Sequence, residues 1–277
     1  MTVSVFGLGI IGSIWARHYE ADGVLAAAWN RSTKAELPRW QPSALEAARQ
    51  ADVLQIVVAD PRAVREVLAA VLPALGPSKL VIQSSTIDPA SAAEFCAKVR
   101  ATGAAYVEAP FTGSKPAAEQ RATVYFLGGE RSDIEAAEPV LSRVSAKRFR
   151  VGTPEQAAAL KLSMNLQIAT VTQALAEGLT FARSAGIADA VFFEVLEHNV
   201  ACSGLVALKG PKLRTADFTP QFSVKHLLKD LKLALGASSA AGLPAAALIA
   251  EQLQRATDKG WADEDFSALF KLIAATE

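Results

Sequence analysis

The sequence predicts an α/β protein in which a mainly parallel β-sheet comes first and an all-helical C-terminal domain follows. In the first half of the chain, short apolar runs typical of strands alternate with alanine-rich helical windows. These strand signals stop after about Thr153. The residues that follow are typical of one long helix, which would join the two parts. We therefore expect two domains, residues 1–153 and residues 154–277.

The expected strands are apolar and bounded by turn residues, and helical windows such as residues 11–20 and 89–100 lie between most of them. Because strands and helices alternate, the sheet should be mainly parallel and covered by helices on both faces. The expected strands are residues 3–6, 25–29, 53–58, 79–83, 105–108, 123–127 and 148–151.

The second half of the chain predicts only helices. Residues 155–185 contain no proline and one glycine, which predicts a helix of roughly 46 Å at ~1.5 Å per residue, ended by Gly186. The later helices are expected from their start and stop signals. These signals are Asp189 as an N-cap, Ser223 as the cap of a helix running to about Ala241, Pro244 opening a helix stopped by Gly260, and Asp263 capping the last.

Composition narrows the possible partners. The chain has 277 residues, of which 51% are apolar, and its 28 basic residues balance its 28 acidic ones. No net charge therefore draws it to nucleic acid or to an anionic membrane, and no apolar run approaches the ~20 residues that span a bilayer. Cys96 and Cys202 are too few for a disulfide framework, and none of the three histidines has a partner at metal-ligand spacing. We expect a cytoplasmic protein that binds no metal, no nucleic acid and no membrane.

A glycine motif follows the first expected strand and opens the first expected helix. It reads Gly7-Leu8-Gly9-Ile10-Ile11-Gly12, in the context that a dinucleotide-binding turn requires. Gly7 would permit the tight turn, Gly9 would let the backbone approach a pyrophosphate, and Gly12 would let the helix pack closely on the strand. The amides at the start of the helix would then face the phosphates. The first domain is therefore expected to be of the Rossmann type.

The residues after the second expected strand indicate which dinucleotide binds. An NAD site usually places an acidic residue here for the ribose 2′-hydroxyl, but this chain has Asn30, Arg31 and Ser32 and no acid until Glu36. A guanidinium group and hydroxyl groups suit a 2′-phosphate instead. The alternative is that Arg31 is only a solvated surface residue. We expect NADP(H) as the cofactor.

Five further motifs are spread along the rest of the chain. They are residues 84–89 after the fourth expected strand, residues 108–114 after the fifth, Lys161 with Asn165, residues 229–231 preceded by Phe222, and residues 260–268. Together with the glycine turn, these motifs resemble the β-hydroxyacid dehydrogenase family of the 3-hydroxyisobutyrate dehydrogenase type. Within that family the chain is most similar to the NADPH-dependent glyoxylate and succinic semialdehyde reductases. The resemblance covers essentially the whole chain.

The resemblance implies that Thr112, Gly113 and Ser114 bind the substrate. These residues lie just beyond an expected strand end, where α/β proteins place ligands. Small residues there expose backbone amides that can hold a carboxylate, and the hydroxyl groups add donors. Taken alone, the same segment could be an ordinary loop rich in proline and glycine.

Lys161 and Asn165 are four residues apart and therefore share one face of the long helix. Because their neighbours are apolar, Lys161 either extends its ammonium group to water or points into a cleft. The resemblance implies the second arrangement, with Lys161 as the proton donor in carbonyl reduction. An ammonium group in that position stabilises and protonates the oxygen on which negative charge develops. Asn165 could hold the same oxygen or orient the lysine.

Three other positions gain a role only through the resemblance. Thr86 would lie beside the nicotinamide, and Lys229 would lie near the cofactor and the substrate. On its own pattern Lys229 belongs to a solvated basic helix face. Phe222 could close the substrate pocket.

The resemblance implies an NADPH-dependent reductase or dehydrogenase of a small aldehyde acid or β-hydroxy acid, assembled as a homodimer. The chain departs from the family at one place, where Glu155 and Ala157 stand in positions that are often glycine. This departure leaves the entry geometry of the helix, and hence the identity of the substrate, open. An imine reductase is an alternative, although such enzymes usually lack a lysine at the position of Lys161. A non-catalytic dinucleotide-sensing protein is another, although it would need neither that lysine nor an intact substrate segment.

Overall fold

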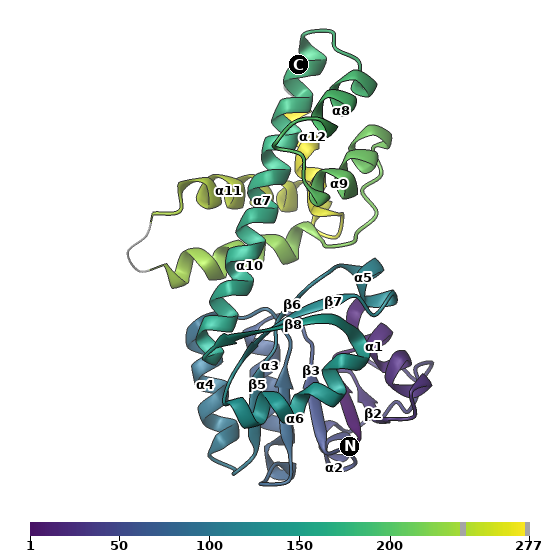
Figure 1. The fold of residues 1–277 in the computed structure, drawn as a ribbon, viewed down its shortest axis with the longest axis vertical. Helices are drawn as coiled ribbons and strands as arrows, with labels where there is room; N and C mark the ends of the chain where they lie inside the picture. Colours follow the sequence, from purple (N-terminus) through teal and green to yellow (C-terminus); the bar gives the residue numbers. More distant parts are fainter. Residues whose placement is uncertain (239–241, 275–277) are drawn as a thin grey trace. The chain divides into compact units, whose positions relative to one another are not determined.

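The computed structural model describes residues 1–238 and 242–274 of the chain. The chain divides into two compact units, Met1–Lys161 and Leu162–Glu277. The first unit contains a β-sheet with helices, and the described part of the second is helical (Figure 1). The predicted fold class is therefore confirmed.

The first unit is built around one mixed, mainly parallel sheet. Its strands are β1 (Val3–Phe6), β2 (Leu25–Trp29), β3 (Val53–Ile56), β4 (Leu80–Gln83), β5 (Ala105–Glu108), β6 (Phe111–Thr112), β7 (Thr123–Gly128) and β8 (Ser145–Gly152). The strand order is β2-β1-β3-β4-β5-β7-β6, and β8 also pairs with β7. Strands β1 to β5 are parallel, whereas β7 is antiparallel to β5 and β6. The strand order reverses at β1, and in such sheets ligands bind beyond the carboxyl ends of the strands at this point.

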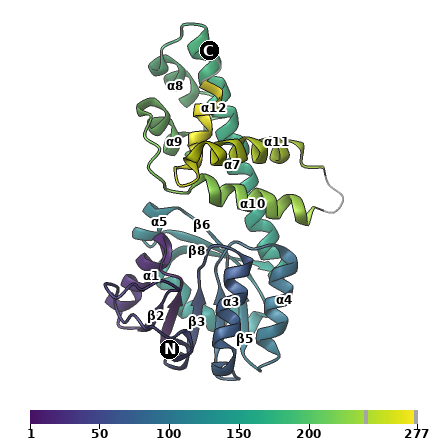
Figure 2. The same ribbon diagram turned by 180° about the vertical axis from the view of Figure 1, so that it is seen from behind.

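Side chains of the strands alternate between two apolar cores, one on each face of the sheet. On β1, Val3 and Val5 belong to one core and Phe6 belongs to the other. The first core is covered by α1 (Ile10–Ala21) and α6 (Arg131–Leu141), and α6 lies in front of the sheet in Figure 1. The second core is covered by three helices, of which α3 and α4 lie in front of the sheet in Figure 2. These helices are α2 (Ala44–Arg49), α3 (Pro61–Val71) and α4 (Pro89–Arg100), and the shorter turns of the unit are η1 (Leu72–Ala74), α5 (Lys115–Glu119) and η2 (Ser142–Val144).

The second unit is a set of helices around a third core. The long helix α7 (Pro154–Ser184) begins in the first unit and continues into the second, close to the predicted bounds. Its companions are α8 (Asp189–Glu197), α9 (Gly204–Thr215), α10 (Val224–Ala237), α11 (Pro244–Ala256), the π-turn η3 (Thr257–Trp261), η4 (Phe266–Leu269) and α12 (Phe270–Ala274). Leucines from α7, α10, α11 and η4 are fully buried together in this core.

Some strand bounds differ from the prediction. β3 ends at Ile56 rather than at residue 58, because Val58 donates its backbone N–H to the Ser85 hydroxyl oxygen (2.8 Å) instead of to a strand. The two-residue strand β6 was not predicted, since so short a run carries no periodicity. β8 begins at Ser145, three residues before the predicted start at residue 148.

Two predicted helix caps were wrong. Asp189 is the first residue of α8 rather than its cap, and its carboxylate instead pairs with Arg183 (2.6 Å). The cap of η4 is Asp265, whose carboxylate accepts from the Ser267 N–H (3.2 Å), and not Asp263. Both acids that were predicted as caps form ion pairs instead, Asp189 with Arg183 and Asp263 with Lys225.

Ser223 occupies the N-cap position of α10 as predicted, but its hydroxyl group bonds to His226 Nδ1 (2.8 Å) rather than to a backbone amide. Helix α10 ends at Ala237, and the predicted end at Ala241 lies outside the described residues. Pro244 opens α11 as predicted. Gly260 lies in the π-turn that follows and has a positive φ of 86°, so the helical path breaks at the predicted glycine.

Candidate functional site

The turn between β1 and α1 contains three glycines in different surroundings. Gly7 has a φ of +104°, and a Cβ atom there would lie 2.2 Å from the Val57 carbonyl oxygen. A Cβ atom on Gly12 would lie 1.9 Å from the Gly7 carbonyl oxygen, whereas one on Gly9 would meet no atom within 4 Å. The backbone is therefore packed against protein at Gly7 and Gly12 and open at Gly9. This is the distribution of space that a bound pyrophosphate group requires.

The first turn of α1 supplies donors next to that open space. Gly9 is the N-cap residue and has no side chain with which to cap the helix. The amides at residues 10–12 are therefore the orphan donors of this helix, and a helix N-terminus attracts phosphate. Leu8 is 3% exposed and Ile11 packs on the core, which fixes the turn, while Ile10 is 52% exposed. These features fit a dinucleotide.

The loop after β2 is tied to the glycine turn by Asn30. The Leu8 N–H donates to Asn30 Oδ1 (3.0 Å), and Asn30 Nδ2 donates to the Ser32 hydroxyl oxygen (2.8 Å). The Arg31 side chain is 79% exposed, and its Nη1 lies 3.6 Å from Glu66 Oε2. The structure thus places Asn30, Arg31 and Ser32 on the loop next to the turn. An exposed guanidinium group in this loop suits a 2′-phosphate.

Thr86 follows a firmly held turn at the carboxyl end of β4. Gln83 Oε1 accepts from the Ser85 N–H (2.6 Å), and Gln83 Nε2 donates to the Ser85 carbonyl oxygen (3.0 Å). The Ser85 hydroxyl oxygen in turn accepts from the Val58 N–H at the end of β3. Thr86 itself is half-buried. The side chain of Gln83 therefore holds both the N–H and the carbonyl oxygen of Ser85, the residue immediately before Thr86.

A buried acid supports the same turn. Glu108, at the end of β5, is 0% exposed and accepts hydrogen bonds from Gln83 Nε2 (2.7 Å) and the Tyr106 hydroxyl group (2.6 Å). Burial raises the pKa of Glu108 to about 8, although both hydrogen bonds act in the opposite direction. In the sequence, Glu108 stands out only as the first residue of the motif at residues 108–114.

The predicted substrate segment begins in β6 and turns into α5. The backbone of Thr112 pairs with Val124 of β7, and Gly113 has a φ of +111°. Ser114 is the N-cap residue of α5, and its side chain forms no capping hydrogen bond. All three residues of the segment are half-buried. The segment therefore runs from the end of a strand directly into the start of a short helix.

The α7 helix carries Lys161 and Asn165 one turn apart, and the two side chains are 9% and 1% exposed. Asn165 Nδ2 donates to Asp230 Oδ2 (2.6 Å), and Lys229 Nζ lies 2.8 Å from Asp230 Oδ1. Within the second unit the structure therefore brings Asn165 and Lys229 together around Asp230, which is 2% exposed. Asp230 was not among the predicted site residues. The available signal was an acidic residue whose helical neighbours Leu227 and Ala234, three residues before it and four after it, are apolar.

Phe222 lies at the start of α10 in an aromatic group. Its ring is parallel to that of His226, with centroids 6.4 Å apart, and meets the edge of Phe266 at 5.8 Å. Its backbone oxygen accepts from the Phe266 N–H (2.9 Å), and its own N–H donates to Asp265 Oδ2 (3.4 Å). The position of Phe222 thus depends on Asp265.

Asp265 belongs to a buried ion pair that was not predicted from the sequence. Lys209 Nζ lies 2.8 Å and 2.9 Å from the two carboxylate oxygens, and the two side chains are 1% and 0% exposed. Burial opposes ionisation of Asp265, but the ammonium group of Lys209 keeps the pKa of that carboxyl below its usual value. Burial lowers the pKa of Lys209, and Asp265 partly offsets this change.

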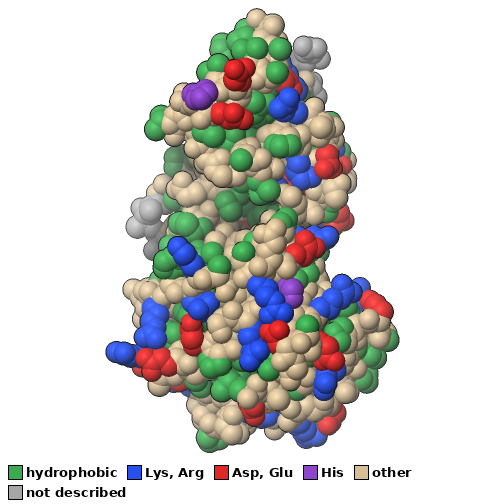
Figure 3. All heavy atoms as spheres, turned by 45° about the vertical axis from the view of Figure 1, so that its right-hand side comes forward, with side chains coloured by type: hydrophobic (Ala, Val, Ile, Leu, Met, Phe, Trp, Pro, Cys, Tyr) green, Lys and Arg blue, Asp and Glu red, His purple; other side chains and the backbone are tan. Residues whose placement is uncertain are grey.

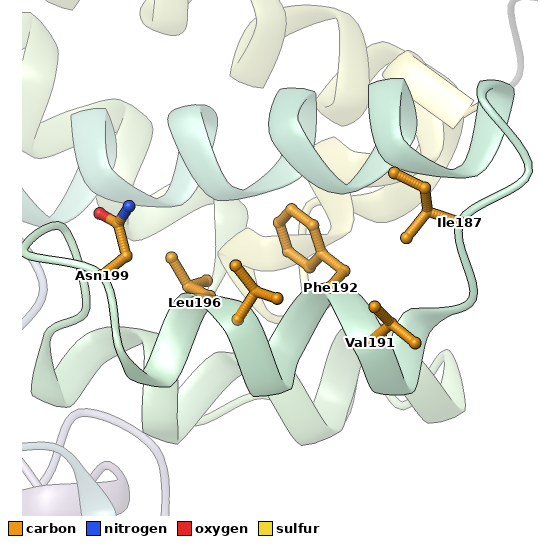
Figure 4. A pocket seen from close by; sticks show the side chains of 6 residues that line it. Ile187, Val191, Phe192, Leu196 and Asn199 are labelled. Carbon is orange, nitrogen blue, oxygen red and sulfur yellow. The ribbon is translucent and has the colours of Figure 1, made fainter.

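An apolar pocket lies along α8 and the turn before it. Figure 4 shows Ile187 at one end, Asn199 at the other, and Val191, Phe192 and Leu196 between them. With Val195, these residues complete the lining of the pocket. Val191 and Val195 are 51% and 63% exposed. Without a charged group in its lining, the pocket does not suit a carboxylate or a phosphate.

The surface and the described side chains give further limits. Figure 3 shows basic and acidic side chains interspersed over the visible face of the sheet-containing unit, as expected for a balanced charge. Among residues 1–238 and 242–274, no group of three His, Cys, Asp or Glu side chains could hold a metal ion. No helix in this part of the chain is long and apolar enough to cross a membrane.

Comparison with known protein families covers both units. Residues 2–152 match the family model of the NAD-binding domain of 6-phosphogluconate dehydrogenase. Residues 156–273 match the model described as the NAD-binding domain of NADP-dependent 3-hydroxyisobutyrate dehydrogenase.

Individual relatives agree with the family models. The chain is 28% identical to glyoxylate/succinic semialdehyde reductase 2, chloroplastic, of Arabidopsis thaliana, covering 100% of this chain and 80% of the relative. It is 27% identical to reductase 1 of the same plant, covering 99% and 98%. A solved structure of 3-hydroxyisobutyrate dehydrogenase from Mycobacterium tuberculosis with L-serine superposes with a TM-score of 0.90 at 27% identity, covering 99% of each chain.

Proposed function

The chain belongs to the 3-hydroxyisobutyrate dehydrogenase type of β-hydroxyacid dehydrogenases, which are NAD(P)-dependent oxidoreductases, and from this membership we propose its specific reaction. We propose that it uses NADPH to reduce a small aldehyde acid, or NADP⁺ to oxidise the corresponding hydroxy acid. The observation that carries this proposal is Lys161 on α7, one turn before Asn165, in a chain that also has the open glycine turn. The cytoplasmic location expected from the sequence stays a prediction, and one relative is named as chloroplastic.

Each proposed site residue has a chemical task. The nicotinamide supplies a hydride when it is bound. Thr112, Gly113 and Ser114 hold the substrate carboxylate, so that the carbonyl group is presented in one orientation. The ammonium group of Lys161 stabilises the negative charge that develops on the carbonyl oxygen and then protonates it. Asp230 holds the amide of Asn165 through the 2.6 Å hydrogen bond and so keeps it in place beside the lysine on α7.

The test is NADPH oxidation with glyoxylate, succinic semialdehyde, methylglyoxal and one cyclic imine as separate substrates. We expect turnover of an aldehyde acid, and Lys161→Ala should lower kcat/KM by about 10²- to 10⁴-fold because the general acid is lost. Lys98→Ala, which removes an exposed lysine on α4, is the matched control and should leave turnover unchanged.

The other outcomes separate the rival functions. Turnover of the imine alone would favour an imine reductase. Tight binding of NADPH with no turnover of any carbonyl compound would favour a dinucleotide-sensing protein. Equal activity of Lys161→Ala and the native chain would show that another group donates the proton.

Cofactor preference can be tested on two arginines with similar surroundings. Arg31 and Arg62 are 79% and 76% exposed, and both lie near Glu66, at 3.6 Å and 3.9 Å. If Arg31 binds the 2′-phosphate, Arg31→Ala should weaken NADPH binding by about tenfold or more and leave NADH binding unchanged. Arg62→Ala should change neither affinity. Equal loss in both variants would indicate only a general effect of surface charge.

The proposal includes a homodimer in which the apolar pocket along α8 faces a second copy. Its lining is five apolar residues and one amide, so a second apolar surface is a better occupant than a charged metabolite. Val195→Glu should shift the chain to a monomer in light scattering coupled to size-exclusion chromatography. Val200→Glu is the control, because Val200 is fully exposed and lies outside the pocket lining. A dimer that survives Val195→Glu would place the interface elsewhere.

A further inference from the structure

A chain of hydrogen bonds crosses the carboxyl ends of three neighbouring strands. It begins at the Tyr106 hydroxyl group on β5 and passes through Glu108 to the Gln83 side chain at the end of β4. The Gln83 side chain hydrogen-bonds both the N–H and the carbonyl oxygen of Ser85. The Ser85 hydroxyl oxygen in turn accepts from the Val58 N–H after β3. Because each side chain in this series is at most 1% exposed, water cannot substitute for a lost partner.

Glu108 is the centre of this series and has an unusual environment. None of the ion pairs among residues 1–238 and 242–274 includes Glu108, although it is fully buried. Its two hydrogen-bonding neighbours, Tyr106 and Gln83, are both uncharged. Ionising a buried carboxyl group without a cation is costly, so such a group tends to keep its proton and to be held by hydrogen bonds.

We propose that Glu108 is a positioning residue for the cofactor site, because its carboxyl group fixes Gln83 and through it the backbone of Ser85 that leads into Thr86. This inference rests on the proposed binding of the nicotinamide end of NADPH beside Thr86. Glu108 acts only through Gln83 and Ser85 and does not itself contact the reacting atoms. The same series holds Val58, so it fixes the loops after β3 and β4 together.

The protonation state of Glu108 follows from the groups that face it. Asp88 at the start of α4 and Glu155 on α7 are both acidic, so they oppose its ionisation. Tyr106 on β5 and Cys96 on α4 carry no charge at neutral pH, since burial raises the pKa of both groups. Because burial also raises the pKa of Glu108 to about 8, the acid stays neutral at pH 7.

A neutral carboxyl group can be replaced by an amide of the same shape. In Glu108→Gln the amide oxygen can accept from Gln83, and the amide nitrogen can donate to the Tyr106 oxygen, which accepts as readily as it donates. In Glu108→Ala the Tyr106 hydroxyl group and Gln83 Nε2 each lose their hydrogen bond to the acid inside the core. Glu108→Gln therefore tests whether an acid is needed at this position, and Glu108→Ala tests whether the hydrogen bonds are needed.

The experiment measures hydrogen exchange of the Ser85 and Val58 amides in the cofactor-free protein, together with the dissociation constant of NADPH. Glu108→Ala should speed exchange of both amides, and it should raise the NADPH dissociation constant by about tenfold or more. Glu108→Gln should restore slow exchange and keep NADPH affinity within about threefold of the native value. Glu46→Gln, an exposed acid on α2, is the control and should change neither quantity.

If Glu108→Ala does not fold, Glu108→Asp provides the same comparison, because the shorter side chain retains the acid but draws it away from Gln83. The inference is overturned if exchange at Ser85 and Val58 is unchanged when the contact is lost. It is also overturned if Glu108→Gln is as disruptive as Glu108→Ala, since that result would require the ionised form. Exchange in the cofactor-free protein does not depend on NADPH chemistry, so a chain that reduces no carbonyl compound would leave this test intact.

Discussion

Each of the two units buries a carboxyl group completely, but the negative charge of the acid is avoided in one unit and paired with a cation in the other. In the sheet-containing unit, Glu108 has only uncharged hydrogen-bonding neighbours, and burial raises its pKa to about 8. In the helical unit, Asp265 lies 2.8 Å from the ammonium group of Lys209, and its pKa is lowered. Both groups fix a segment next to a proposed binding residue, Thr86 in one unit and Phe222 in the other.

The difference shows that burial alone does not set the charge of an acid. A proton neutralises the acid at the sheet edge, and a lysine neutralises the acid between the helices. The contribution of Glu108 to stability changes between pH 4.5 and about 8, whereas that of Asp265 changes only in acid, below about pH 3.8. Each therefore leaves a separate signature in the stability of the protein.

The largest expected effect comes from removing the cation. Lys209→Ala leaves Asp265 buried without its partner and should lower the free energy of unfolding by about 3–5 kcal/mol in a urea titration. The double variant Lys209→Met with Asp265→Asn removes both charges and should be closer to the native stability. If Lys209→Ala were as stable as the double variant, the ion pair would not be what compensates for the burial of Asp265.

The next effect concerns the pH dependence of stability. Between pH 4.5 and about 8 the unfolded chain releases a proton that folded Glu108 retains. The free energy of unfolding should therefore fall by about 1.4 kcal/mol for each pH unit in this window from this group alone. Glu108→Gln should remove this slope, which urea titrations at pH 5, 6, 7 and 8 would measure.

Asp265 predicts the opposite slope in acid. Because its folded pKa is lowered, its contribution to stability is present above the unfolded value of 3.8 and is lost as pH falls through the folded pKa. The double variant at Lys209 and Asp265 should lose this acid-side slope and keep the slope between pH 4.5 and about 8 that Glu108 produces. A shared pH profile for the Glu108 variant and the double variant would contradict the comparison.

The smallest effect is expected from an acid that is not buried. Asp22 accepts hydrogen bonds from Nη1 and Nη2 of Arg121, at 2.7 Å and 3.0 Å. Hydrogen bonding to this arginine lowers the pKa of Asp22. The two side chains remain 21% and 35% exposed, so solvent screens the pair. Asp22→Asn should cost less than about 1 kcal/mol in the same titration. A cost equal to that of Lys209→Ala would mean that exposure, on which the comparison rests, is not the deciding variable.

The sheet and the glycine turn were predictable because their signals are local. The short apolar runs identified seven of the strands, and the motif from Gly7 to Gly12 appears within one strand-turn-helix segment. The long helix was equally clear, since residues 155–185 contain no proline and only one glycine. Strand β6 was not predicted, because two residues are too few to show the alternation of apolar and polar side chains that indicates a strand.

The buried polar contacts were not predictable, because each joins residues far apart in the chain. Gln83 and Glu108 meet only when β4 and β5 pair, and Lys209 and Asp265 are separated by 56 residues. A sequence shows the polar residue but not whether its partner will be water, a cation or an amide. For the same reason Asp230 was passed over, although Lys229 beside it was selected.

The unequal surroundings of the three turn glycines have a consequence for how the gene tolerates mutation. Any side chain at Gly12 collides with the Gly7 carbonyl oxygen, so a substitution there should remove the folded protein from the cell. A side chain at Gly9 meets nothing within 4 Å, so a substitution there should leave abundance unchanged while cofactor use is lost. A mutational scan that scores abundance and activity separately would therefore show two adjacent members of one motif under different kinds of selection.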